Sequence, residues 1–179
     1  RRQRQMCIRD RGIPYRIETD QTLAEEDWAN AWKRFYHPTH LGKRLVVCPS
    51  WEEYTPTPEE LVMTLDPGMA FGSGTHHTTR LCCELLEQLP IEHTRILDMG
   101  TGSGILSIAA LMLGAQEAVG VDIDKVAVRT AAENAEVNGF GPDRSTAVAA
   151  DLIHQPLEEE LTRGGFDIVL ANIVADVII

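Results

Sequence analysis

Residues 96–104 read Ile96-Leu-Asp-Met-Gly-Thr-Gly-Ser-Gly104, an apolar strand that ends in an acid and opens into a glycine-rich turn. A helix of small and apolar residues follows over 105–110, and a second apolar strand over 118–121 ends at Asp122. The turn glycines let the backbone adopt conformations that a Cβ would forbid and approach a ligand closely. Asp122 stands where an acid accepts hydrogen bonds from a ribose. We therefore interpret this stretch as a cofactor-binding βαβ unit.

The spacing of the glycines separates this unit from two other nucleotide-binding motifs. A dinucleotide fingerprint requires glycine or alanine at position 105, where this chain has isoleucine. A P-loop requires a lysine after the glycines, and none follows here. Asp98, two residues before Gly100, would repel a pyrophosphate but suits a cofactor with an amino group and a sulfonium. A plain strand–helix junction also uses glycines, but it does not explain why Asp98, Asp122 and Asp151 all fall at strand ends.

Short apolar strands alternate with helices along the chain, which predicts a mostly parallel, Rossmann-like α/β sheet. Beyond the βαβ unit, we expect strands at 44–48, 61–65, 146–149 and 166–171, and helices at 25–35, 75–89 and 125–138. Asp124 is a good N-cap for the last helix, and Gly139 is a good C′ residue. From the helix over 75–89, four leucines are expected to face the core: Leu81, Leu85, Leu86 and Leu89.

Composition excludes several classes of function. The net charge of −11 argues against a general nucleic-acid binder, which needs basic surface, and permits a basic protein substrate. No apolar run approaches the roughly 18 residues of a membrane span, and no signal peptide is visible. Four cysteines without CxxC spacing fit a reduced cytosolic setting. His76 and His77 are adjacent and make a poor metal pair. These features predict a cytoplasmic monomer with no metal site, no membrane contact and no direct nucleic-acid contact.

The order of motifs resembles that of class I S-adenosylmethionine methyltransferases. In that family the glycine turn, here with Gly100 and Gly102, passes beside the amino-acid portion of S-adenosyl-L-methionine. The acid after the second strand of the sheet, Asp122, holds the ribose hydroxyls. The acid after the third strand, Asp151, lies by the adenine. The resemblance therefore implies a methyltransferase whose cofactor binds at the carboxyl ends of these strands.

A longer stretch, Asp66-Pro-Gly-Met-Ala-Phe-Gly-Ser-Gly-Thr-His-His-Thr-Thr79, resembles the signature of the bacterial PrmA family. Members of that family methylate the large-subunit ribosomal protein numbered eleven. The resemblance runs from Gly12 to Ile179, and Ser73 and His77 depart from the commonest signature without removing a mapped contact. It implies four residues that contact the cofactor: Thr79, Gly100, Asp122 and Asn172.

Two of these positions, and Phe71 in the same signature, have a physical interpretation as well. Phe71, in a glycine-rich loop, is suited to cover the cofactor as part of a flap, although simple core packing explains it equally well. Thr79 offers its hydroxyl to the cofactor or caps its helix. Asn172 follows the fourth strand, at the edge where such sheets bind ligands. The residues after it, Ile173-Val-Ala175, lack the Pro-Pro-aromatic platform of enzymes that methylate bases or glutamine, which favours a flexible aliphatic amine.

The function that follows is S-adenosylmethionine-dependent transfer of methyl groups to lysine or N-terminal amines of a large-subunit ribosomal protein, with Asn172 as the catalytic residue that orients the amine. No general base can be named. Two alternatives stay open. One is a related methyltransferase that acts on another protein or a small molecule, and the other is a module that binds the cofactor without catalysis.

The two ends of the chain suggest a piece of a longer protein. Residues 1–11 carry five arginines and resemble a translated sequencing adapter, so we expect them to be non-native; a nucleic-acid arm is the alternative. Residues 12–40 are expected to be the remnant of an N-terminal region, with Trp28 and Trp32 on a linker helix. Residues 41–179 are expected to form the cofactor-binding catalytic domain, truncated after the fourth strand of the sheet.

Overall fold

The computed structural model describes residues 33, 36–66, 76–151, 154 and 157–173. The chain divides into two compact units, Arg1–Tyr36 and His37–Ile179, and the second holds the strands and helices described below. The predicted helix over 25–35 lies outside the described residues except for Lys33, and the loop with Phe71 lies outside them as well. Within the described ranges, none of the helices combines the length and the apolarity that crossing a bilayer would require.

The second unit contains the strands and helices that the sequence predicts there, with strand ends shifted by at most two residues, and also two short elements, over 39–40 and 159–162, that were not predicted. In chain order the elements are β1 (Thr39–His40), β2 (Leu45–Cys48), β3 (Leu61–Thr64), α3 (His77–Leu86), β4 (Arg95–Met99), α4 (Ile105–Met112), β5 (Glu117–Asp122), α5 (Lys125–Val137), β6 (Ser145–Ala149), α6 (Glu159–Thr162) and β7 (Ile168–Ala171).

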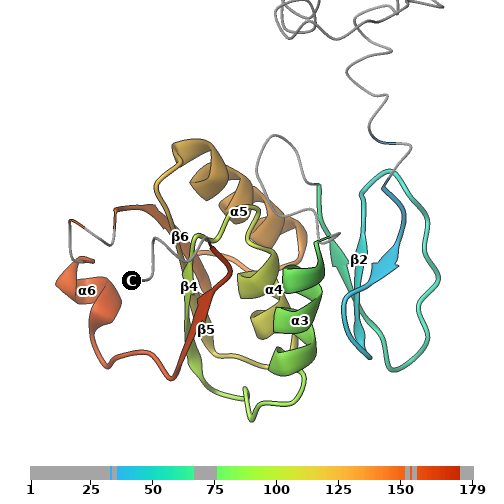
Figure 1. The fold of residues 1–179 in the computed structure, drawn as a ribbon, viewed down its shortest axis with the longest axis horizontal. Coiled ribbons are helices and arrows are strands. Elements are labelled where there is room, and N and C mark those ends of the chain that lie inside the picture. The colour runs from blue at the N-terminus through green and yellow to red at the C-terminus, as the bar shows by residue number, and fades with distance from the viewer. Residues whose placement is uncertain (1–32, 34–35, 67–75, 152–153, 155–156, 174–179) are drawn as a thin grey trace, which may run out of the picture. The chain divides into compact units, whose positions relative to one another are not determined.

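Two sheets organise this unit. The larger one has four strands in the order β6-β5-β4-β7, and every neighbouring pair in it is parallel. The smaller one has the order β1-β2-β3, with β1 antiparallel to β2 and β2 parallel to β3. Helices α3 and α4 lie between the two sheets, and α6 lies on the other side of the larger sheet (Figure 1). The predicted α/β fold with a parallel sheet is therefore confirmed.

The buried residues of both sheets and of the helices between them form one hydrophobic core. Its fully buried members include Leu45 and Met63 from the smaller sheet, Cys83 from α3, Ile96 from β4 and Ile108 from α4. Because α4 is apolar nearly all round, it can pack against both sheets at once. The smaller sheet is thus continuous with the core of the larger one.

The prediction that four leucines of the helix after residue 75 face the core is wrong for three of them. Exposed instead are Leu81 at 56%, Leu85 at 60% and Leu89 at 45%. The buried line of α3 runs through Thr79, Cys83 and Leu86, which also has helical spacing. The leucines and this buried line both have helical spacing, so the spacing alone could not tell which side of α3 faces the core. The contact of α3 with α4 decides which side is buried. Leu89 lies beyond the C-cap at Glu87.

Glu87 joins the end of α3 to the hairpin that begins the smaller sheet. Its Oε2 accepts a hydrogen bond from Lys43 N at 2.7 Å. Its Oε1 accepts from Arg44 N at 2.8 Å and Leu45 N at 2.9 Å. A Cβ on Gly42 would lie 2.6 Å from the Glu87 carboxyl carbon, so a larger residue there would have to displace the carboxylate from its present position. This clamp fixes the smaller sheet to α3.

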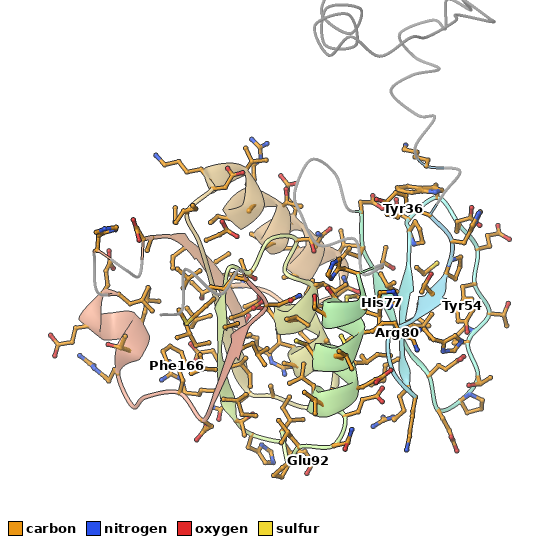
Figure 2. The ribbon with its side chains drawn as sticks, in the orientation of Figure 1. Tyr36, Tyr54, His77, Arg80, Glu92 and Phe166 are labelled. Carbon is orange, nitrogen blue, oxygen red and sulfur yellow. The ribbon has the colours of Figure 1, made fainter. Side chains whose placement is uncertain are left out.

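Arg95 holds the opposite, amino-terminal edge of the larger sheet. Its Nε donates to Glu117 Oε2 at 2.8 Å, across from β4 to β5. Its Nη1 donates to the carbonyls of Arg163 and Gly165, both at 2.6 Å. The guanidinium carbon lies 5.1 Å from the ring centroid of Phe166, which Figure 2 labels. These contacts tie the connection between α6 and β7 to the sheet.

Candidate functional site

The carboxyl ends of the parallel strands meet at one edge of the larger sheet, and the glycine-rich turn follows β4 there. Gly100, Gly102 and Gly104 have φ of +71°, +55° and +82°, in the left-handed region that favours glycine. Gly100 N and Thr101 N both donate to Val121 O, at 2.8 and 3.0 Å, so the turn is tied to β5. The prediction that these glycines serve backbone conformation is confirmed.

Asp98 lies under the turn, with 1% of its surface exposed. Its Oδ2 accepts hydrogen bonds from Thr101 Oγ1 and Ser107 Oγ, both at 2.8 Å. Burial raises the pKa of this carboxyl above its ordinary value, the two hydroxyls oppose that rise, and the charge of Asp122 adds to it. The structure therefore places the Asp98 side chain under the turn, where its hydrogen bonds brace the turn from below.

Asp122 stands at the end of β5 and faces the same turn. Its Oδ2 accepts a hydrogen bond from Gly102 N at 3.0 Å, and its Oδ1 accepts from Asp124 N at 3.0 Å. Asp124 in turn caps α5 by accepting from Val126 N at 2.8 Å, as predicted. Ile123, between the two acids, is 78% exposed. The ends of β4 and β5 thus present a half-buried carboxylate, turn amides and an exposed aliphatic side chain together.

Thr79 and Asn172 meet at the other flank of the turn. Asn172 follows β7, and its Nδ2 donates to Thr79 Oγ1 at 3.2 Å. Thr79 lies in the first turn of α3 and is 3% exposed. Ile173 packs onto the glycine turn so closely that a Cβ on Gly100 would lie 2.2 Å from its Cγ2. Residues from α3, β4 and β7 therefore converge on one place.

Asp151 lies two residues beyond β6, the next strand from Asp122. Its Oδ2 is 2.8 Å from Nδ1 of His154, an ion pair when the imidazole is protonated. Its side chain is 45% exposed, which leaves it accessible at this edge of the sheet. Phe71, the predicted cover of the cofactor, is outside the described residues.

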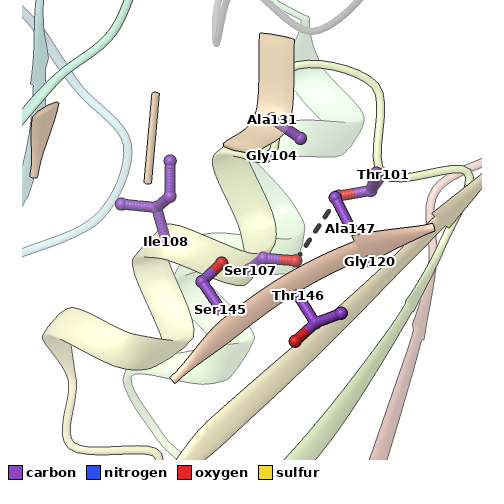
Figure 3. A pocket seen from close by; sticks show the side chains of 9 residues that line it. All are labelled: Thr101, Gly104, Ser107, Ile108, Gly120, Ala131, Ser145, Thr146 and Ala147. Carbon is purple, nitrogen blue, oxygen red and sulfur yellow. Dashed lines mark hydrogen bonds between the residues drawn. The ribbon is translucent and has the colours of Figure 1, made fainter. Parts of the chain in front are cut away.

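A narrow crevice runs beneath the turn, between α4, α5 and the strands β5 and β6 (Figure 3). It is lined by small side chains, among them Thr101 and Ser107, whose hydroxyl oxygens are 3.4 Å apart. It has an internal cavity volume of about 0 Å³, whereas ligand pockets typically enclose roughly 300–1,000 Å³. We therefore assign the crevice to the packing under the turn and not to a ligand.

Several residues of this region were not singled out from the sequence. Ile123 is one, although an exposed aliphatic residue between two acids at a strand end is a readable signal. Ser107 is another, because a serine inside a small-residue helix gives no sign that it bonds an acid nine positions earlier. Asn134, whose Nδ2 donates to Ser103 O at 2.8 Å, belongs to a different helix and could only be found in three dimensions.

A parallel sheet in the order β6-β5-β4-β7, with a glycine turn after β4 and an acid after β5, defines a Rossmann-like domain of the class I methyltransferase type. The family model described as ribosomal protein L11 methyltransferase (PrmA) matches residues 4–179. The chain belongs to that family.

Individual relatives agree with the family. The ribosomal protein L11 methyltransferase of Geobacter metallireducens is 51% identical over 158 residues, which are 88% of this chain and 49% of the relative. That of Symbiobacterium thermophilum is 50% identical over 157 residues, again 88% and 49%. The chain therefore spans about half the length of the curated relatives it matches. The crystal structure of ribosomal protein L11 methylase from Lactobacillus delbrueckii subsp. bulgaricus is similar, with a TM-score of 0.69 at 36% identity, covering 80% of this chain and 69% of that one.

Proposed function

We propose that this chain carries the S-adenosylmethionine-binding and methyl-transfer site of a ribosomal protein L11 methyltransferase. The observation that carries the proposal is the convergence, at one edge of the parallel sheet, of residues from four elements: Thr79, Gly100, Asp122 and Asn172. The names of the relatives support the same reaction, and the acidic net charge of −11 suits a basic protein substrate.

The residues present fit the cofactor. Each oxygen of Asp122 accepts one backbone hydrogen bond, and a carboxylate oxygen has two lone pairs, so each can accept a ribose hydroxyl as well. Ile123 offers an exposed apolar surface to the adenine ring, and Asp151 offers an acceptor to the adenine amino group. Gly100 and Gly102 let the amino-acid portion approach the turn backbone. When bound, S-adenosylmethionine supplies a methyl group on a sulfonium that is already activated toward a nucleophile.

Asn172 is positioned to orient the amine that receives the methyl group. Because its Nδ2 donates to Thr79 Oγ1, its Oδ1 is left to accept an N–H from the substrate. An ammonium has no lone pair, so the substrate must lose a proton before attack, and we assign that proton to solvent. The chain then contributes alignment and exclusion of water, which are the main requirements once the methyl group is activated.

The test is calorimetric titration of S-adenosylmethionine into the 179-residue chain, its Asp122→Ala variant and Glu136→Ala, an exposed acid on α5. We expect the first substitution to weaken binding by about tenfold or more and the second to leave it unchanged. Transfer of labelled methyl groups to ribosomal protein L11 then separates an enzyme from a module that only binds. A folded chain that binds no S-adenosylmethionine would contradict the proposal.

A further inference from the structure

Helix α5 touches the glycine turn and the smaller sheet through one row of side chains, Ala131, Asn134 and Asn138, spaced i, i+3 and i+7. The row starts with a close backbone approach. A Cβ on Gly104 would lie 3.1 Å from both Cα and Cβ of Ala131, so glycine on one side and alanine on the other let the turn rest on the helix. Small residues at this crossing bring the two asparagines within hydrogen-bond reach of their partners.

Asn134 binds the turn directly. Its side chain is 6% exposed, and its Nδ2 donates to the carbonyl of Ser103 at 2.8 Å. A buried carbonyl needs a hydrogen-bond donor, and Asn134 supplies one to Ser103 from α5. Asn134 therefore holds the glycine turn at a fixed distance from α5.

Asn138 binds the end of the smaller sheet. Its Oδ1 accepts from Thr64 N at 2.9 Å, and its Nδ2 donates to Thr64 O at 2.6 Å, the same pair of bonds that a neighbouring strand would make. The same Nδ2 also donates to Asn134 O at 2.8 Å. A continuous chain of hydrogen bonds thus runs from Ser103 in the turn, through both asparagines, to the end of β3.

The other end of α5 begins beside the proposed ribose-binding acid. Asp124, its N-cap, donates its backbone N–H to Asp122 Oδ1 at 3.0 Å. Asp122 Oδ2 in turn accepts from Gly102 N at 3.0 Å. A shift of α5 would therefore move the turn and the Asp122 carboxylate relative to each other.

We propose that Asn134 and Asn138 are positioning residues for the cofactor: together they form an amide bridge, from Ser103 to Thr64, that holds the glycine turn in its ligand-binding position. The inference rests on the proposed function. Since the turn lies beside the amino-acid portion of the cofactor, loss of the bridge affects ligands that carry this portion. Ligands that end at the sulfur depend on Asp122 and Ile123 and are affected less.

The experiment compares two thioether ligands by calorimetric titration. S-adenosylhomocysteine carries the amino-acid portion, and 5′-methylthioadenosine lacks it. Both are titrated into the 179-residue chain, its Asn134→Ala and Asn138→Ala variants, and Glu136→Ala as an exposed control on the same helix. We expect each asparagine variant to bind S-adenosylhomocysteine about tenfold more weakly, with less than about a threefold change for methylthioadenosine. The control should match the parent for both ligands.

The outcomes separate the two proposals. Equal losses for both ligands, or no loss for either, overturn the bridge while the proposed function stands. A parent chain that binds neither ligand overturns the proposed function and the bridge with it. Should an alanine variant fail to fold, Asn138→Asp keeps the acceptor for Thr64 N and removes both donors. Its turn amides at 102–104 should then exchange hydrogen faster than in the parent, and unchanged exchange also overturns the bridge.

Discussion

Asn172 Nδ2 donates a hydrogen bond to Thr79 Oγ1 at 3.2 Å, joining residues that are 93 positions apart in the chain. Thr79 is buried in the first turn of α3, and Asn172 lies just past β7, so the bond closes the site across two elements. Since Nδ2 makes this bond, Asn172 Oδ1 is left as an acceptor for another donor. Two residues that the family resemblance implied are therefore linked physically.

Replacing Thr79 with valine should weaken S-adenosylmethionine binding by about tenfold. Valine keeps the shape of threonine but leaves Asn172 Nδ2 without its acceptor, and an unpaired buried donor is unfavourable by about 1–3 kcal/mol. Thr79→Ser keeps the hydroxyl and serves as the matched control, with affinity close to that of the parent. Calorimetric titration measures both. Equal affinities for the valine and serine variants would show that this hydrogen bond does not position Asn172.

Replacing Gly100 with alanine should destabilise the fold more than the same change at Gly139. Both glycines have positive φ, +71° and +81°, so each alanine carries about 1–2 kcal/mol of backbone strain. The new Cβ at position 100 would also lie 2.2 Å from Ile173 Cγ2, whereas nothing lies within 4 Å at position 139. Overpacking adds about 1–3 kcal/mol at the first site. Urea unfolding provides the measurement.

The same two glycine substitutions made in an Ile173→Ala variant test the cause of the difference. Ile173→Ala removes the Cγ2 atom that the new Cβ would meet, so it should reduce the additional destabilisation at position 100 and leave the strain common to both glycines. Equal losses of unfolding free energy at positions 100 and 139 in the parent, or an additional loss at position 100 that stays unchanged in Ile173→Ala, would mean that Ile173 does not crowd the turn.

Leu86→Ala should lower the free energy of unfolding by about 2–5 kcal/mol, as is usual for a fully buried leucine. Leu85→Ala, one residue earlier in α3, should change it by less than about 0.5 kcal/mol because Leu85 is 60% exposed. Guanidinium unfolding of the two variants tests which row of α3 faces the core. A larger loss at Leu85 would reverse the assignment made from the structure.

The Glu87 clamp should make stability depend on pH at the acidic end. Burial by itself would raise the pKa of Glu87, but the backbone hydrogen bonds from Arg44, Lys43 and Leu45 outweigh it and hold the pKa below its ordinary 4.5. A carboxyl with a lowered pKa in the folded state stabilises the fold above its unfolded pKa. That stabilisation is lost as pH falls through the folded value.

Glu87→Gln tests this dependence, since glutamine keeps the shape and cannot ionise. The free energy of unfolding of the parent should fall more steeply below pH 4.5 than that of the variant, and the two curves should converge in acid. The measurement is denaturant unfolding across a pH series. Parallel curves would mean that the Glu87 carboxylate does not contribute through its charge.

The residues of the βαβ unit and of the helix cap that follows it were predictable because their roles depend on positions close by in the chain. Gly100, Gly102 and Gly104 need positive φ within one turn, Asp122 ends its strand, and Asp124 caps the helix that follows by accepting from Val126 N. Each of these requirements is satisfied within a few positions of the chain. Asp98 was placed correctly at the strand end, yet its side chain turns under the loop because Thr101 and Ser107 supply buried donors.

The sequence by itself determined the alternation of strands and helices, the glycine turn and the acid after the second strand of that unit, because these depend on short-range backbone conformation and hydrophobic period. Tertiary structure alone decided which row of α3 is buried, that Asn172 meets Thr79, and that Asn134 and Asn138 link the turn to the smaller sheet. These contacts join residues 31 to 93 positions apart. They form because packing of the helices between two sheets brings distant side chains within hydrogen-bond distance, which no local pattern encodes.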